Sequence, residues 1–168
     1  LFTSTAYSAN PADIPLLRRK VGDVIARAGL APGSHAGKAL ANILETFPRD
    51  ELFQISETDL ARISSGVLRL LLRPRTHLFI RRDRFDRYVS ALLYTPRDSY
   101  TSELRTRAHK KLAEAYGGRT SAFYPSFGDG PLARVHLIIG LSPGHPEPDE
   151  DSLDLQMRPE RHNKVKVL

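Results

Sequence analysis

Four stretches of the chain carry apolar residues at the spacing of an amphipathic helix. Aliphatic side chains recur every three or four residues, and arginine, lysine, glutamate and small polar residues lie between them. The four predicted helices are residues 14–28, 34–47, 57–73 and 101–116. A glycine or proline follows each stretch and ends the helix, because neither residue continues a helix well. The first two predict a helical pair, and the last two predict helices that each lay an apolar stripe on a sheet.

Shorter stretches are rich in branched and aromatic residues or alternate between apolar and polar positions, which is typical of strands. The predicted strands are residues 1–7, 52–55, 77–82, 88–94, 121–124 and 132–141. Residues 77–82 and 88–94 flank a short turn, which predicts a hairpin. From residue 52 the predicted order is β-α-β-β-α-β, followed by one additional strand. This order predicts an α+β, ferredoxin-like antiparallel sheet preceded by the helical pair.

The same pattern predicts how the chain divides. Residues 1–50 are expected to be a helical segment that ends a preceding domain, and residues 51–142 a sheet domain. Residues 143–168, which include an acidic run, are expected to be a charged tail or linker. The chain of 168 residues begins at Leu1 and contains one methionine, Met157, so we interpret it as a piece of a longer protein.

Composition excludes several kinds of chemistry. There is no cysteine, which rules out a disulfide framework, a zinc-thiolate site and a cysteine nucleophile. The longest apolar runs are too short to predict a transmembrane helix. Neither a glycine-rich phosphate-binding motif nor a pair of histidines at metal-binding spacing is present. The sequence therefore predicts no active site, no metal site and no cofactor in this chain.

The formal net charge of +6 raises the alternative of a nucleic-acid-binding module. RNA-binding domains of this fold class stack bases on aromatic side chains of their central strands. The nearest match is residues 84–89, which lack the small residues of that pattern and include Asp86. Many arginines have an acidic neighbour, as Arg82 has Asp83 and Arg87 has Asp86, which favours a solvated arginine-rich surface. RNA binding remains the alternative function, and a free-standing small enzyme is a more distant one.

Three long strings of residues resemble one known family. Residues 14–21, 37–53 and 85–100 closely resemble the amino-terminal regulatory region of the large bacterial NAD-specific glutamate dehydrogenases. The resemblance runs from residue 1 to about 141 and includes residues 132–136. It implies an ACT-type regulatory domain within an oxidoreductase of amino-acid metabolism.

The resemblance also implies a parent enzyme that converts L-glutamate, NAD and water into 2-oxoglutarate, ammonia and NADH, in the cytoplasm and as a homo-oligomer. NAD would bind outside this chain, and the implied partners are other domains and subunits of the same enzyme. ACT modules often bind an allosteric amino-acid effector near the turn after their first strand, where a glycine allows close approach. Residues 55–58, which occupy that place here, contain no glycine. A structural role in the oligomer is therefore an equal alternative to effector binding.

Three residues are candidates for an effector site or an interface: Arg97, Asp98 and Arg81. Arg97 and Asp98 join the second hairpin strand to the helix that begins near Thr101. The guanidinium of Arg97 is suited to a bidentate pair with a carboxylate of a neighbouring domain or of an amino acid. Asp98 is also suited to a local role as a turn or cap residue.

Overall fold

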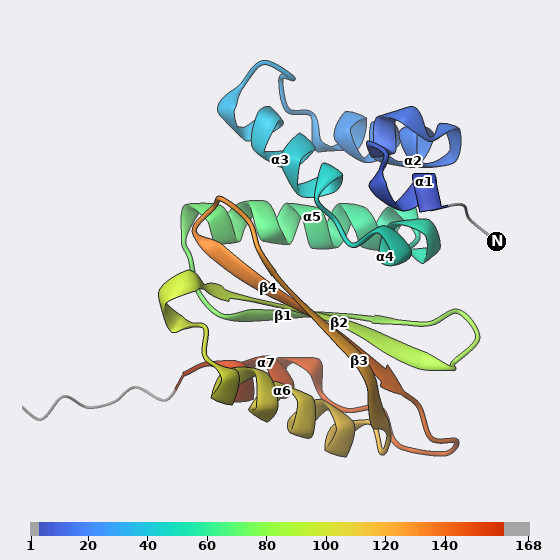
Figure 1. Ribbon diagram of the computed structural model, residues 1–168, viewed down its shortest axis with the longest axis vertical. Coiled ribbons are helices and arrows are strands. Elements are labelled where there is room, and N and C mark those ends of the chain that lie inside the picture. Colours follow the sequence, from blue (N-terminus) through green and yellow to red (C-terminus); the bar gives the residue numbers. More distant parts are fainter. Residues whose placement is uncertain (1–3, 160–168) are drawn as a thin grey trace, which may run out of the picture. The chain divides into compact units, whose positions relative to one another are not determined.

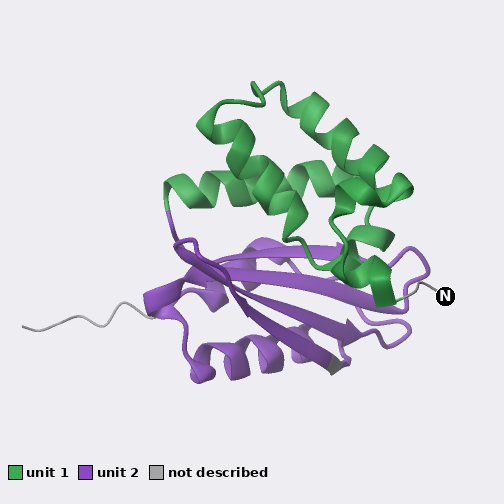
Figure 2. Ribbon diagram, turned by 45° about the horizontal axis from the view of Figure 1, so that its top comes forward, with its two compact units in different colours: residues 1–73 green, residues 74–168 purple. Residues whose placement is uncertain are grey.

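A computed structural model describes residues 4–159, except for the side chains of residues 120 and 121. The chain forms two compact units, residues 1–73 and 74–168 (Figure 2). Each unit is described by itself below.

The first unit consists of helices. In chain order they are α1 (Ser4–Ser8), the short 3-10 helix η1 (Pro11–Asp13), α2 (Pro15–Ala28), α3 (His35–Glu45), α4 (Arg49–Gln54) and α5 (Glu57–Leu72). Helices α2, α3 and α5 pack against one another. Their buried residues include Leu17, Leu40, Leu44, Leu60 and Ile63. Ser34 and Ser56 accept hydrogen bonds from backbone N–H groups in the first turns of α3 and α5, which confirms the predicted helix starts.

Two predicted strands are helices in this unit. Residues 52–55 lie in and just after α4, and residues 4–7 lie in α1, whereas residues 1–3 are outside the described part. Asp50 and Glu51 occupy the first turn of α4, where negative charge is favourable. At its other end, Lys20 Nζ donates to the carbonyls of Leu52 and Ile55, both at 2.9 Å. These contacts satisfy the helix ends and outweigh the strand preference of four apolar-rich residues.

The second unit contains a four-stranded sheet of antiparallel neighbours in the order β1-β2-β4-β3 (Figure 1). Its elements are β1 (His77–Arg82), β2 (Tyr88–Pro96), the 3-10 helix η2 (Arg97–Ser99), α6 (Ser102–Ala115), β3 (Arg119–Phe127), β4 (Leu132–Gly140) and α7 (Glu150–Met157). The predicted hairpin is confirmed, with His77 opposite Tyr94 and Arg82 opposite Val89. Thr101 accepts a hydrogen bond from Leu104 N and caps α6, at the predicted start of this helix.

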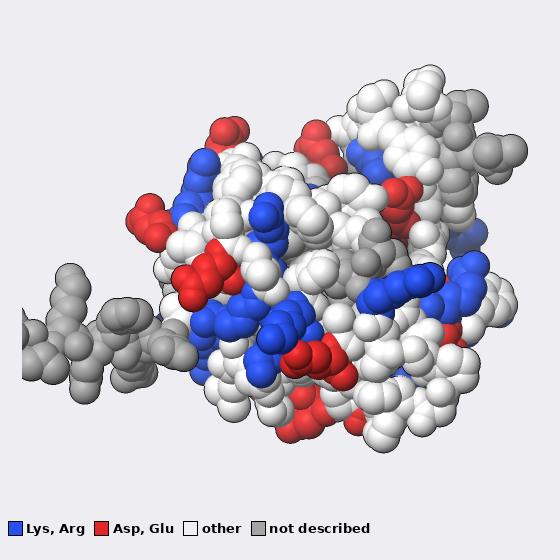
Figure 3. Space-filling model, turned by 60° about the horizontal axis from the view of Figure 1, so that its bottom comes forward, with Lys and Arg blue, Asp and Glu red and all other residues white. Residues whose placement is uncertain are grey.

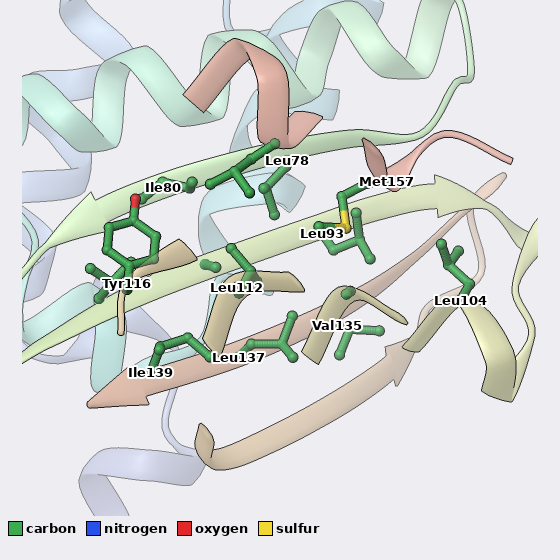
Figure 4. Packing of buried hydrophobic residues seen from close by; sticks show 14 residues of the cluster. Leu78, Ile80, Leu93, Leu104, Leu112, Tyr116, Val135, Leu137, Ile139 and Met157 are labelled. Carbon is green, nitrogen blue, oxygen red and sulfur yellow. The ribbon is translucent and has the colours of Figure 1, made fainter. Parts of the chain in front are cut away.

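The core of this unit lies between one face of the sheet and helices α6 and α7 (Figure 4). Alternate residues of the strands supply the sheet side of the core, because successive strand side chains point to opposite faces. The main contributors are Leu78, Ile80, Val89, Leu93, Val135, Leu137 and Ile139 from the strands, Leu104, Leu112 and Tyr116 from α6 and its end, and Leu153 and Met157 from α7.

Helix α7 covers the place on the sheet that the sequence assigned to residues 57–73. The stripe of Leu60, Ile63 and Val67 on α5 belongs instead to the first unit, where α5 packs on α2 and α3. The chain thus divides after Arg73 and not after residue 50. The expectation of a charged tail from residue 143 is also corrected, because α7 lies within residues 143–168.

A buried carboxylate anchors α7 to the sheet. Asp154 Oδ1 accepts a hydrogen bond from Leu78 N at 2.7 Å and lies 2.9 Å from His77 Nδ1. Asp154 Oδ2 accepts from Arg158 Nη2 at 3.0 Å. With only eight residues and a high proportion of acids, α7 has a weak sequence pattern. Its position depends on contacts with residues more than seventy positions away in the chain.

The ferredoxin-like fold class is confirmed, but its elements follow in a different order along the chain. Strand β4 lies between β2 and β3, so β2, α6 and β3 form a split β-α-β unit. Strand β1 occupies the edge position that the last strand of a β-α-β-β-α-β chain would take, and α7 follows β4 and contacts β1. The second unit therefore runs β-β-α-β-β-α.

The turn after α6 requires glycine. Gly117 has a φ of +58°, and a Cβ on Gly118 would lie 1.7 Å from the carbonyl oxygen of Gly140. The close approach of this turn to the end of β4 fixes the direction in which β3 enters the sheet.

We expect Leu112→Ala to lower the free energy of unfolding by about 2 to 5 kcal/mol, because it leaves a cavity between α6 and the sheet. Leu112 is fully buried, whereas Leu155 on α7 is 59% exposed, which makes Leu155→Ala the matched control. Denaturant unfolding measures both variants. If Leu112→Ala is as stable as Leu155→Ala, the described packing of α6 is wrong.

Candidate functional site

Arg97 lies in η2, where β2 passes into α6, and it is exposed. Its backbone N–H donates to the carbonyl of Pro131 at 3.0 Å. Its Nη1 donates to the carbonyls of Gly128 and, at 3.5 Å, Gly130. Arg97 therefore ties the loop before α6 to the turn between β3 and β4, a contact that the sequence did not predict.

Asp98 follows Arg97 in the first turn of η2 and is also exposed. The cap of α6 is Thr101 and not Asp98. Arg97 and Asp98 thus lie together on one exposed loop at the end of β2, where both can reach a ligand or a neighbouring domain.

Arg81 lies elsewhere in the same sheet. It pairs with Ser90 across the hairpin, and Arg97 follows Ser90 by seven positions along β2 and into η2. At about 3.3 Å per residue this distance exceeds about 20 Å, so Arg81 and Arg97 do not share a site. Arg81 Nη1 donates to the carbonyl of Arg82 at 3.3 Å, and its guanidinium carbon is 5.9 Å from the centroid of the Tyr88 ring.

The turn between β1 and β2 contains two ion pairs, and neither pair joins residues that are adjacent in the sequence. Asp83 pairs with Arg87, with 2.7 Å between Oδ2 and Nε, and Asp86 pairs with Arg82, with 2.6 Å between Oδ1 and Nε. Each acid thus pairs with the arginine four residues away in place of its immediate neighbour. Asp83 also accepts hydrogen bonds from the backbone N–H groups of Phe85 and Arg87.

These bonds stabilise the ionised form of Asp83. The hydrogen bond from the Arg87 side chain, with the two backbone N–H donors, lowers the pKa of Asp83 to about 2, although burial opposes the shift. The carboxylate therefore stays charged well below neutral pH.

We expect Asp83→Asn to destabilise the second unit by about 1 to 3 kcal/mol near pH 6, because charge-assisted hydrogen bonds are lost. A lowered pKa means that this stabilisation is complete above about pH 4 and disappears as the pH falls through about 2. Thermal melts between pH 6 and pH 2 should show the difference from the parent chain narrowing with acidity. Asp129→Asn, at an exposed residue of the β3–β4 turn, should show no such convergence.

The charged surfaces of the chain carry residues of both signs. A groove on the outer side of α6 is lined by residues of both signs, including Glu103, Arg107, Lys110 and Glu114. The face of the molecule in Figure 3 likewise shows basic and acidic side chains interspersed. This distribution agrees with the predicted solvated arginine-rich surface more than with a continuous basic stripe for nucleic acid.

The RNA-binding pattern at residues 84–89 does not place its phenylalanine on the sheet. Phe85 lies in the β1–β2 turn, outside both strands. Among the described residues, no group of three or more histidines, aspartates or glutamates could hold a metal ion. Within the same range of the chain, no helix is long and apolar enough to cross a membrane.

The antiparallel sheet with α6 and α7 on one face defines the second unit as an α+β, ferredoxin-like module of the ACT type. The family model described as glutamate dehydrogenase, ACT2 domain, matches residues 77–160, which is half of the chain. A second model, glutamate dehydrogenase, helical motif 1, matches residues 14–73. The chain therefore belongs to the glutamate dehydrogenase family represented by these two models.

Curated relatives support the same conclusion. The chain is 40% identical to an NAD-specific glutamate dehydrogenase of Halomonas elongata over 139 residues, which is 83% of this chain and 9% of that protein. It is 36% identical to the protein of the same name from Pseudomonas aeruginosa over 143 residues, which is 85% of this chain and 9% of that protein. It is 34% identical to the protein of that name from Mycobacterium tuberculosis over 141 residues, which is 84% of this chain and 9% of that protein. The chain spans about a tenth of the length of these relatives.

Proposed function

We propose that this chain is a regulatory or assembly module of a larger, cytoplasmic NAD-dependent glutamate dehydrogenase that works as a homo-oligomer. One observation carries the proposal. Two models of consecutive parts of that enzyme match residues 14–73 and 77–160, and the chain divides between the same two segments, after Arg73. The boundary between the two family models coincides with the boundary between the two structural units. This agreement supports descent of the whole segment from such an enzyme.

The proposed chemistry of the parent is the oxidation of L-glutamate to 2-oxoglutarate and ammonia, with reduction of NAD. NAD and the reacting groups would lie in the other nine tenths of the enzyme. The role of this chain would be to hold subunits or domains together, or to transmit the binding of an amino-acid effector.

The loop that carries Arg97 and Asp98 is the proposed contact point. The place assigned to the effector turn by the sequence, residues 55–58, follows helix α4 and begins α5 in the first unit. In the observed order, β2 and α6 begin the split β-α-β unit, so the turn between them corresponds to the turn after the first strand of an ACT module. That turn contains no glycine and presents a guanidinium and a carboxylate, which suits a charged amino acid or a polar domain interface.

We expect Arg97→Lys to leave the fold intact, because an ammonium can still donate to the carbonyls of Gly128 and Gly130. The variant loses the bidentate fork, so domain association or the effector response of the full-length enzyme should weaken about tenfold. Sedimentation and effector titration of the full-length enzyme measure these effects. Arg119→Lys, another exposed arginine of this unit, is the control. Unfolding of the Arg97 variant would make the residue structural, and normal assembly with a normal response would refute the contact.

A second prediction tests the parent activity. The full-length protein should reduce NAD with L-glutamate, whereas the isolated 168-residue chain should neither catalyse this reaction nor bind NAD with a low-micromolar dissociation constant. The reason is that the sequence offers no glycine-rich turn from a strand into a helix for the pyrophosphate. Absorbance at roughly 340 nm, where NADH absorbs, measures the reduction of NAD. Calorimetric titration measures the binding of NAD. Steeply salt-dependent RNA binding by the chain would instead favour the alternative function.

A further inference from the structure

The tip of the β1–β2 hairpin presents an exposed aromatic side chain between two arginines. Phe85 is 70% exposed, more than any other phenylalanine that the structure describes. The guanidinium carbons of Arg84 and Arg87 lie 5.7 and 5.2 Å from the centroid of its ring. We call these three residues the Phe85 knob. Phenylalanine and arginine in this arrangement resemble the aromatic and cationic residues that dominate binding at protein interfaces.

Hydrogen bonds and ion pairs within the turn hold the knob in one conformation. Asp83 accepts hydrogen bonds from the backbone N–H groups of Phe85 and Arg87, at 3.3 and 3.2 Å, and from the Arg87 side chain. Asp86 adopts a φ of +55°, a conformation uncommon for a residue with a side chain, and its carboxylate is bound by Arg82. An ordered loop loses little conformational freedom on binding, so the contact energy of the ring is not spent on ordering the turn.

Among the described residues, the charges of the turn pair off except for that of Arg84. Arg82 and Arg87 pair with Asp86 and Asp83. In the part of the chain that the structure describes, Arg84 contacts the Phe85 ring and forms no ion pair. A partner that receives the ring is therefore complementary when it offers a carboxylate beside an apolar pocket.

We propose that the Phe85 knob inserts into an apolar, carboxylate-rimmed pocket on another part of the same large enzyme, outside this chain. This inference rests on the proposed function. The chain accounts for 9% of the length of its curated relatives, so most of the protein surface that could receive the knob lies outside it. The knob is then a specificity contact that sets where the module docks.

Nucleic acid is a less suitable partner for the same surface. The carboxylates of Asp83 and Asp86 lie in the turn itself, and Glu147 approaches it through a contact of 3.4 Å with Arg82 Nη1. These carboxylates offset the charges of Arg82 and Arg87, so the turn offers little net positive charge to a phosphate backbone, whereas a protein pocket need present only one carboxylate to Arg84. The ring also lies in the turn and not on the sheet face where RNA-binding domains stack bases.

A photo-cross-linking experiment on the full-length protein tests the proposal. The photoreactive amino acid p-benzoylphenylalanine replaces Phe85, and the same residue replaces Tyr124, which is 58% exposed on β3, in a control protein. Irradiation of the assembled enzyme followed by peptide mass spectrometry should give, from position 85 only, a cross-link to a segment outside this chain that contains aspartate or glutamate. A cross-link to co-purified RNA, no cross-link, or the same product from position 124 would overturn the proposal.

Two variants test the ring and the charge separately. Phe85→Ala should weaken association of the module with the rest of the enzyme about thirtyfold, as expected for a hot-spot aromatic. Arg84→Glu should weaken this association more at low salt than at high salt, because its effect is electrostatic and salt screens it. Tyr124→Ala and Arg119→Glu are the matched controls and should leave association unchanged. Mass photometry of the full-length protein measures association between subunits, and hydrogen exchange of residues 83–87 measures docking within a subunit. Thermal melts should be unchanged because the altered side chains are exposed.

The outcomes separate this proposal from the proposed function. If Phe85→Ala assembles normally while the enzyme oxidises glutamate, the knob is not a docking contact and the proposed function stands. If the full-length protein shows no glutamate-dependent reduction of NAD, the proposed function fails, whatever the cross-link.

Discussion

The second unit depends on covering one apolar face of its sheet. Strands β2 and β4 lie in the middle of the sheet and contribute Val89, Leu93, Leu137 and Ile139, all fully buried, to the helix side. Their exposure to water would be costly, since each buried aliphatic side chain stabilises the fold by about 1.5 to 3 kcal/mol. One helix of four turns is not wide enough to cover four strands. The requirement for a second helix explains why α7, although short and acidic, is part of the folded unit.

The attachment of α7 illustrates how one polar contact makes an apolar cover specific. Leu153 and Met157 supply the buried apolar contact, and the carboxylate of Asp154 accepts a hydrogen bond from the N–H of Leu78. That N–H belongs to an edge strand and would otherwise need water or another strand as its partner. The same residue therefore closes the start of the sheet edge and fixes the position of the helix.

Arginine has at least three distinct roles in this chain. Arg87 stabilises a turn through Asp83, and Arg97 joins two loops through backbone carbonyls. Arg84 contacts an exposed ring without an ion pair in the described structure. The positive net charge is thus distributed over local structural tasks and a few exposed cations, which accords with a module that contacts other protein surfaces.

Local sequence was sufficient for the elements whose signals are strong and near in the chain. The helical stripes, the serine and threonine caps and the stop at Gly117 each depend on residues within about four positions of one another. The β1–β2 hairpin joins two strands that are neighbours in the sequence across one short turn. The α+β class also followed from the pattern of predicted helices and strands, and the glutamate dehydrogenase family followed from long strings of residues that carried the resemblance. The candidate residues Arg97 and Asp98 could be placed on one loop, but not given partners.

Tertiary structure decided what distant contacts control. Residues 52–55 have the composition of a strand, yet Lys20, more than thirty positions earlier, satisfies the carbonyls at the end of the helix that they form. Amphipathicity alone did not show which helices cover the sheet, because α5 and α6 both carry an apolar stripe. Only the packing of the folded chain assigns α5 to the first unit. The pairing of Asp83 with Arg87 and Asp86 with Arg82 likewise required the geometry of the turn, since each acid has a closer arginine in sequence. A side-chain pattern specifies which face is apolar, but its partner is chosen by the competition among all such faces in the folded chain.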